Sequence, residues 1–291
     1  MSRNRATAIG FTAVLQWALL ALFTIGSTPV PPLLLNAVCF AIGGALGVIW
    51  VLANGRARVL RTIPLGVYLF GTIGLFGAHL LYFTAFRMAP MAETGLIAYL
   101  WPLIIVLMSG FLPGERLTVL HILGALVAFA GAALIVFRGS GGFDATALPG
   151  FGVAFMFALT WAGYSVLSRR LGDVPTESVV VFCLAAAVLS GLAHLALEDT
   201  VWPASVWGWL SIAALGIGPV GLAFFTWDIG MKHGDIQLLG VASYAAPLLS
   251  TLALVAADIT PASPTILVAA GLIAAGAALA ALASRRRASA G

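Results

Sequence analysis

Long apolar runs are the feature that most restricts how this chain folds. Ten of them have the roughly 20 mostly apolar residues that a membrane-spanning helix needs. They lie near residues 6–26, 31–53, 63–87, 91–111, 117–137, 148–169, 177–197, 204–231, 235–256 and 264–284. Only 8% of the 291 residues are charged, whereas a soluble domain has about 25%. The sequence therefore predicts an all-α membrane protein with ten transmembrane helices and no separate soluble domain.

The basic residues give the expected orientation. If the N-terminus is cytoplasmic, twelve of the 14 Lys and Arg residues fall in cytoplasmic segments, and only Arg87 and Arg138 fall outside. Cytoplasmic connections of membrane proteins carry such an excess of positive charge. A missed helix would destroy this alternation, so it also supports the count of ten. We expect both termini to be cytoplasmic.

Charge and cysteine content argue against several other classes. The net charge of +4 is spread over the connections, so we expect no nucleic-acid partner. Cys39 and Cys183 both lie inside apolar runs, where they are expected to be small buried residues. The sequence thus predicts no disulfide, no metal site and no cofactor. The first apolar run lacks a cleavage site and is expected to be retained as a helix.

An internal repeat divides the chain into two parts. The segment Gly95–Leu103 matches the segment Gly240–Leu248, and both contain Gly-x-x-x-Tyr-x-x-Pro-Leu. The same offset of 145 residues pairs Gly71 with Gly216. Similarity between apolar helices often arises by chance, but a shared motif in one long register is much rarer. The repeat predicts a first five-helix half over residues 1–145 and a second over 146–291.

Five helices per half is an odd number, so the second half must cross the membrane upside down relative to the first. Arg87 and Lys232 match in the repeat but fall on opposite predicted sides. Two inverted halves are typical of secondary transporters, in which they alternately open the site to each side. The alternative is a duplicated membrane protein that transports nothing.

The chain resembles the drug/metabolite transporter superfamily, with two EamA-type repeats. The residues that carry the resemblance are Glu93–Leu103, Gly114–Thr118 followed by Gly124 and Gly131, and Trp161–Ser165. The similarity is greatest to the bacterial exporters of aromatic amino acids and metabolites. It implies a bacterial inner-membrane exporter. Two positions depart from the pattern: the first helix has Ala21-Leu22-Phe23 in place of a Trp-Gly pair, and Thr260 occupies the repeat position of Glu115.

Polar and aromatic residues within the apolar runs are candidates for a substrate cavity, because polar groups deep in a membrane are costly unless they serve a purpose. An aromatic residue at a helix end more often anchors the helix at the membrane surface. His79 fits equally well as a hydrogen-bonded packing residue. The expected cavity residues are Gln16, Trp17, His79, Tyr82, Tyr99, Trp101, Trp161, Tyr164, Trp227, Ser243 and Tyr244.

Two prolines and one carboxylate have separate expected roles. Pro102 and Pro247 match in the repeat and should each kink a helix, which suits a pair of hinges. Asp228 is a possible coupling site, or a polar cap near Lys232. Small residues at four-residue spacing, namely Gly124, Ala128 and Ala132, and Gly271 and Ala275, are expected to form close helix packing or a dimer surface.

These features favour one function over its rivals. A cavity of aromatic and uncharged polar groups suits a zwitterion with an apolar side chain, held by cation–π contact and hydrogen bonds. We therefore expect an alternating-access exporter of aromatic or neutral amino acids or related metabolites, acting as a monomer or homodimer. Alternatives are an exporter of another drug or metabolite class, a channel, or a scaffold. An intramembrane enzyme is disfavoured because no cluster of acids, histidines or nucleophiles occurs.

Overall fold

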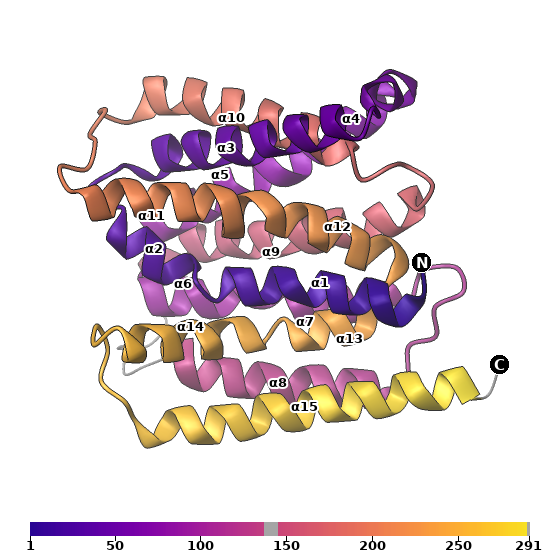
Figure 1. The fold of residues 1–291 in the computed structure, drawn as a ribbon. Helices are drawn as coiled ribbons and strands as arrows, with labels where there is room; N and C mark the ends of the chain where they lie inside the picture. Colours follow the sequence, from indigo (N-terminus) through magenta and orange to yellow (C-terminus); the bar gives the residue numbers. More distant parts are fainter. Residues whose placement is uncertain (137–144, 290–291) are drawn as a thin grey trace.

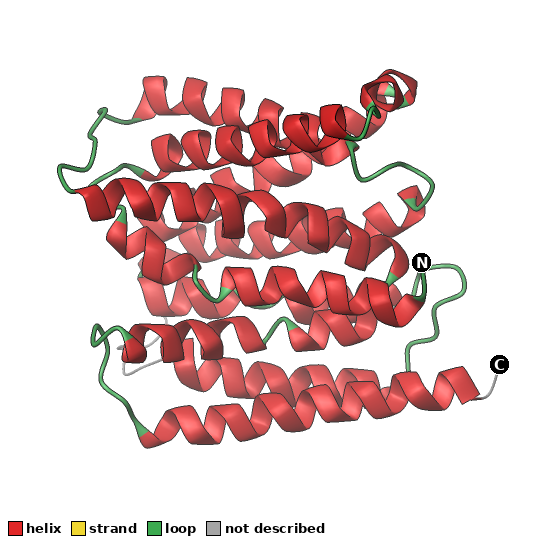
Figure 2. Cartoon of the chain, in the orientation of Figure 1, coloured by secondary structure: helices red, strands yellow, loops and turns green. Residues whose placement is uncertain are grey.

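The computed structural model describes residues 1–136 and 145–289. Over these residues the chain consists of helices joined by loops, with no strand (Figure 2). Ten of the helical segments in this part of the chain are long and apolar enough to cross a membrane, which confirms the predicted fold class. The start of α1 (Arg3–Trp17) and the end of α15 (Pro264–Ser289) lie at the same end of the bundle (Figure 1).

Of the first five spans, two are continuous helices and three are interrupted. The second and fifth are single helices, α3 (Pro32–Ala53) and α8 (Val119–Val136). The first is α1 followed by α2 (Leu20–Gly26), and the fourth is α6 (Met91–Ala98) followed by α7 (Trp101–Ser109). The third is α4 (Leu65–Thr72), the π-helix η2 (Ile73–Gly77) and α5 (Ala78–Met88). A 3-10 helix, η1 (Ala57–Thr62), precedes it.

The last five spans follow a similar plan. The sixth consists of η3 (Ala145–Ala147), α9 (Leu148–Ser168) and η4 (Arg169–Leu171). The seventh is α10 (Ser178–Leu197), and the tenth belongs to α15. The eighth is α11 (Val206–Ile217), the π-helix η5 (Gly218–Leu222) and α12 (Ala223–His233). The ninth is α13 (Ile236–Ala242) followed by α14 (Ala245–Ala256).

Helix boundaries recur at the offset seen in the sequence. The two π-helices begin 145 residues apart, at Ile73 and Gly218. The same spacing separates the starts of α6 and α13, at Met91 and Ile236. A π-helix is rare and needs a locally strained backbone, so its recurrence at matched positions is a specific similarity between the two halves of the chain.

The broken fourth and ninth spans explain the positions of the two prolines. α6 ends at Ala98, four residues before Pro102, and α13 ends at Ala242, five residues before Pro247. Each proline thus lies in the first turn of the following helix, α7 or α14, where its missing N–H is not needed for a helical hydrogen bond. The predicted kinks are present as complete breaks, located one turn before the prolines.

The predicted span ends differ from the observed ones by at most three residues where both are described. The largest differences are at the first span, which begins at Arg3, and the sixth, which begins at Ala145. Arg138, predicted on the outer side, lies outside the described residues. One break has no sequence signal: α1 ends at Trp17 without a nearby Pro or Gly.

Two helix pairs dominate the packing. α8 and α15 make the most extensive contact, followed by α3 and α10. Gly124 of α8 lies against Gly276 of α15, where a Cβ on residue 124 would be 2.7 Å from the Gly276 backbone oxygen. The prediction of close packing is correct for Gly124, Ala128 and Ala132, which are buried. Gly271 and Ala275 are exposed because α15 turns a different stripe toward α8, so their other predicted role, in a dimer surface, stays a prediction.

Ion pairs show which connections share a face of the bundle. Arg3 at the start of the first span contacts Glu115 between the fourth and fifth and Asp235 between the eighth and ninth. Arg169 at the end of the sixth span also contacts Glu115. We call this end of the bundle the terminal face. Arg87 and Glu198 pair at the other end, the opposite face. α1 therefore begins at the face where α9 ends.

Candidate functional site

Four tryptophans from four different spans meet in the core. They are Trp17 of α1, Trp101 of α7, Trp161 of α9 and Trp227 of α12. Every pair among them has ring centroids within 6.5 Å, and the shortest separation, between Trp17 and Trp227, is 5.0 Å. We call these residues the tryptophan cluster. It draws two members from each half of the chain.

Hydrogen bonds fix two of the four indoles. The Trp17 N–H donates to the carbonyl of Pro219 at 3.1 Å, and the Trp227 N–H donates to the Ser165 hydroxyl at 3.0 Å. Pro219 lies in the π-helix η5, where the wider turn alters the backbone hydrogen bonding. The interruption of the eighth span thus has a direct role in holding the cluster.

Further aromatic rings extend the cluster toward the third span. Phe224 contacts Trp17, Trp161 and also His79, whose ring centroid is 5.7 Å away. The His79 Nδ1 atom lies 2.7 Å from the Leu75 carbonyl of its own helix. Because a carbonyl only accepts, Nδ1 carries a proton there and His79 is oriented by its backbone. This contact agrees with the hydrogen-bonded packing role predicted for His79, and its role in lining a cavity stays a prediction.

Three of the predicted tyrosines belong to the third, fourth and sixth spans. The ring centroids of Tyr164 and Trp161 are 5.5 Å apart. Tyr82 of α5 packs on Phe157, which lies in α9 one turn before Trp161. The Tyr82 and Tyr99 side chains are close enough to interact electrostatically. Of these three phenol rings, that of Tyr164 has a ring contact with the tryptophan cluster among the described residues.

Five of the expected cavity residues have side-chain polar groups without a hydrogen-bond partner in the part of the chain that the structure describes. Within the described residues, no hydrogen bond is made by the side chains of Tyr82, Tyr99, Trp101, Trp161 and Tyr164. None of these five is among the polar atoms that are fully enclosed without a partner. The donors of these five side chains are therefore not used within the described part of the protein.

Other predicted residues use their polar groups within the protein. The Gln16 amide donates to the Thr12 carbonyl, and the Ser243 hydroxyl donates to the Leu239 carbonyl. Tyr244 is fully buried in a separate core with Phe129, between α8, α14 and α15. Its hydroxyl accepts the backbone N–H of Leu103, 3.1 Å away. The structure therefore does not bring Tyr244 to the tryptophan cluster.

Tyr244→Phe should destabilise the protein without weakening ligand binding. The Leu103 N–H belongs to the first turn of α7, where no preceding helical carbonyl accepts it, because the fourth span is broken. Loss of its partner should cost about 1–3 kcal/mol. Thermal unfolding in detergent would show a lower midpoint, with unchanged affinity for substrate. Weaker binding at an unchanged midpoint would instead place Tyr244 in the cavity.

Asp228 is engaged in an ion pair rather than free in the cavity. Its carboxylate lies 2.9 Å from the Lys232 ammonium and accepts a hydrogen bond from the Thr176 hydroxyl at 2.8 Å. Lys232 also donates to the Val174 carbonyl. These contacts tie α12 to the connection after α9 and favour the second role predicted for Asp228, that of a polar cap.

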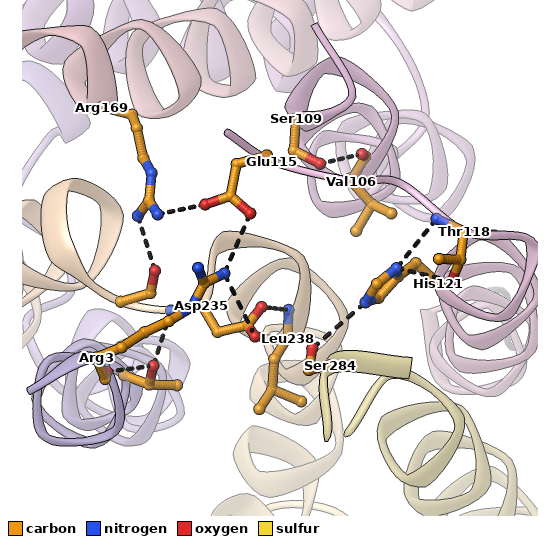
Figure 3. A network of polar contacts seen from close by, with 12 residues as sticks. Arg3, Val106, Ser109, Glu115, Thr118, His121, Arg169, Asp235, Leu238 and Ser284 are labelled. Carbon is orange, nitrogen blue, oxygen red and sulfur yellow. Dashed lines mark hydrogen bonds and ion pairs between the residues drawn. The ribbon is translucent and has the colours of Figure 1, made fainter. Parts of the chain in front are cut away.

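The sequence did not indicate a buried ionic network at the terminal face (Figure 3). Arg3 Nη2 lies 3.1 Å from Glu115 Oε2 and 3.5 Å from Asp235 Oδ2. Arg169 pairs with the other Glu115 oxygen and donates to the Met231 and Gly234 carbonyls at 3.0 and 2.7 Å. The Glu115 side chain is only 3% exposed. We call Arg3, Glu115, Arg169 and Asp235 the terminal network.

A second carboxylate organises the opposite face. Glu198 accepts the backbone N–H groups of Leu33 and Leu34 at the start of α3, and it contacts His194 and Arg87. Burial opposes the ionisation of this group, but the hydrogen bonds outweigh it and lower the pKa of Glu198. Glu198 thus links α10 to the N-terminus of its closest partner, α3.

The lowered pKa predicts how Glu198 affects stability at different pH. Because the ionised form is favoured in the folded state, the stabilisation is fully present above the ordinary Glu pKa of about 4.3 and is lost as the pH falls below it. Glu198→Gln should therefore unfold more easily than the parent by about 2 kcal/mol at pH 7. Thermal midpoints measured from pH 7 to pH 3 should converge. A difference that persists at pH 3 would contradict this account.

Comparisons with known proteins agree with this architecture. The sequence matches the EamA-like transporter family over residues 5–137 and 148–282. It is 52% identical over 288 residues to the aromatic amino acid exporter YddG of Ancylobacter novellus, covering 98% of this chain and 100% of that protein. The exporter of the same name from Salmonella typhimurium is 27% identical, covering 99% of this chain and 100% of that protein.

A solved crystal structure has the same fold. It superposes with a TM-score of 0.94 at 53% sequence identity, covering 98% of this chain and 99% of the other. Within the described residues, no group of three or more His, Cys, Asp or Glu side chains is arranged to hold a metal ion. The family match spans both halves and includes the helices that carry the tryptophan cluster, so the chain belongs to the EamA-like transporter family.

Proposed function

We propose that this protein exports aromatic amino acids from the cytoplasm by alternating access. The observation that carries the proposal is the tryptophan cluster, in which two indoles from each half of the chain meet with free donors nearby. The relatives named as aromatic amino acid exporters support the substrate class. An aromatic side chain would stack among the indoles in offset or edge-to-face geometry.

The charged groups of an amino acid also find partners in this site. Its ammonium group would lie against an indole face, because the ring quadrupole attracts cations. Its carboxylate would accept from the free donors of Trp101, Trp161 and the three tyrosines. An anion without an ammonium group is disfavoured, since the cluster contains no Arg or Lys.

The transport cycle is proposed to use the two halves, residues 1–145 and 146–291, as inverted repeats. Two features support this: helix starts recur 145 residues apart (91 and 236), and α1 begins at the face where α9 ends. The breaks before Pro102 and Pro247 would be the hinges, because the interrupted backbone there has fewer helical hydrogen bonds to distort.

The proposed location is the bacterial inner membrane, with the terminal face in the cytoplasm. The support is the distribution of basic residues, most of which lie in connections at the terminal face. The protein is proposed to act as a monomer or homodimer on small-molecule substrates. No role in energy coupling is assigned to Asp228 because it is paired with Lys232.

Uptake into proteoliposomes tests the proposal. Purified protein would be reconstituted and offered labelled phenylalanine, tyrosine, tryptophan, leucine and glutamate, with and without a pH gradient. Saturable uptake of the aromatic amino acids is expected. Stimulation by the gradient would show proton coupling. Absence of saturable uptake for every amino acid would reject the function, and linear, unsaturable flux would indicate a channel.

A further inference from the structure

The terminal network connects the helices that carry the tryptophan cluster. Arg3 opens α1, which carries Trp17, and Arg169 directly follows α9, which carries Trp161. Glu115 lies in the connection that leaves α7, which carries Trp101. Arg169 also holds the last carbonyls of α12, which carries Trp227. Ends of all four helices are therefore joined at one face (Figure 3).

Glu115 occupies the centre of this arrangement. It accepts from Arg3 of the first half and from Arg169 of the second, so that one carboxylate joins the two halves. The Glu115 and Arg169 side chains are 3% and 17% exposed, so water screens their ion pair less than a surface pair, whereas Arg3 is 36% exposed. Removing the carboxylate would take away the ion-pair partner of Arg169 and leave Arg3 with only its longer contact to Asp235.

Some polar atoms in and beside the terminal network have no hydrogen-bond partner among the described residues, as expected of a contact that has to open. Arg3 Nε is buried without a hydrogen-bond partner. Gln237, two residues after Asp235, is fully buried, and neither of its side-chain polar atoms has a partner. Buried unpaired polar groups each raise the free energy of the state that contains them. Opening the face to water would relieve them and offset part of the cost of separating the ions.

The two closely packed helix pairs differ from the tryptophan-bearing helices in taking no part in the terminal network. α3 with α10 and α8 with α15 have extensive contacts and contribute no member of the terminal network. The residue that matches Glu115 in the repeat is Thr260, so the second half has no equivalent carboxylate at this position. The network therefore holds the tryptophan-bearing helices specifically, and at one face.

We propose that Glu115 is the hub of an ionic gate that closes the terminal face and must break for the tryptophan cluster to open toward that side. The inference rests on the proposed alternating-access function and adds the contact that controls one of its two openings. It assigns Glu115, Arg3, Arg169 and Asp235 to gating rather than to substrate contact.

Thiol labelling tests the gate without requiring transport. Ser168, buried at the end of α9 beside Arg169, would be changed to Cys as a reporter. Cys39 and Cys183 are buried and provide the unlabelled background, checked with protein that lacks the reporter. A charged maleimide would be added to purified protein, and the rate of labelling followed. Glu115→Gln should increase this rate about tenfold by shifting the population toward the open terminal face.

Glu177→Gln is the matched control. Glu177 is a buried carboxylate at the same face, paired with the half-exposed Arg56 beside the α3–α10 pair, and it lies outside the network. The Glu177→Gln variant should therefore leave the labelling rate of the Ser168→Cys reporter unchanged. If Glu115→Gln fails to fold, Arg3→Gln removes only a partly exposed partner and should also increase the rate.

The outcomes separate the gate from the proposed function. Equal labelling of the parent and the network variants would overturn the gate, as would equal acceleration by Glu177→Gln. Faster labelling in Glu115→Gln combined with no amino-acid uptake by the parent would support the gate and reject the substrate assignment. Amino-acid uptake by the parent, combined with an unchanged labelling rate in the network variants, would support the substrate assignment and reject the gate.

Discussion

Trp101→Ala should abolish high-affinity recognition of aromatic amino acids while the protein still folds. Trp101 contributes an indole face within 6.4 Å of Trp17, Trp161 and Trp227, and its N–H is free for a substrate carboxylate. Aromatic pairs contribute about 0.5–1.5 kcal/mol each, so loss of several contacts should cost about 2 kcal/mol, or roughly 30-fold in the saturation constant. Concentration dependence of phenylalanine uptake in proteoliposomes provides the measurement.

Two further variants serve as controls for Trp101→Ala. Trp101→Phe keeps an aromatic ring but removes the N–H, so it should restore much of the affinity lost in Trp101→Ala. Trp209→Ala removes an exposed indole that stacks on Trp202 at the surface, and it should leave the saturation constant unchanged. An unchanged saturation constant in Trp101→Ala would show that the substrate does not contact the cluster.

Gly124→Val should prevent assembly of the helix bundle. A Cβ at this position would lie 2.7 Å from the Gly276 backbone oxygen and 3.2 Å from the Ala280 backbone nitrogen. Backbone atoms of a neighbouring helix cannot move aside like a flexible side chain, so α8 and α15 would have to separate. We expect a loss of about 3 kcal/mol or more, seen as aggregation or a much lower thermal midpoint.

Gly271→Val is the matched control for this prediction. The substitution has the same effect on intrinsic helix propensity, but no heavy atom lies within 4 Å of the position where the new Cβ would be placed. It should therefore yield monodisperse protein with a midpoint close to that of the parent. Similar behaviour of the two variants in size-exclusion chromatography would refute the close contact between α8 and α15.

The spans were predictable because their physical cause is local. Each needs about 20 apolar residues, and the charges between them are few and regularly placed. The kinks near Pro102 and Pro247 also follow from local chemistry, since proline lacks an N–H. The break after Trp17 has no such local signal, and the contact of the Trp17 indole there is with Pro219, some 200 residues away in the chain.

The site was only partly predictable for a similar reason. The sequence identified Trp17, Trp101, Trp161 and Trp227 as candidate cavity residues, but not that all four converge. Tyr244 looks equivalent to Tyr99 in the repeat, yet its hydroxyl caps α7 in a different core. The terminal network is not predictable from the sequence, because arginines in the connections fit the charge bias of membrane topology whether or not each has a specific carboxylate partner.

Counterflow is the measurement that tests the central claim most directly. Proteoliposomes loaded with a high concentration of unlabelled phenylalanine would be diluted into a trace of labelled phenylalanine. A carrier that alternates between two faces predicts a transient accumulation of label above equilibrium, because outward movement of unlabelled substrate returns the site to the outside. The same overshoot should be absent with Trp101→Ala. Label that rises only to equilibrium in the parent would contradict alternating access and indicate a channel.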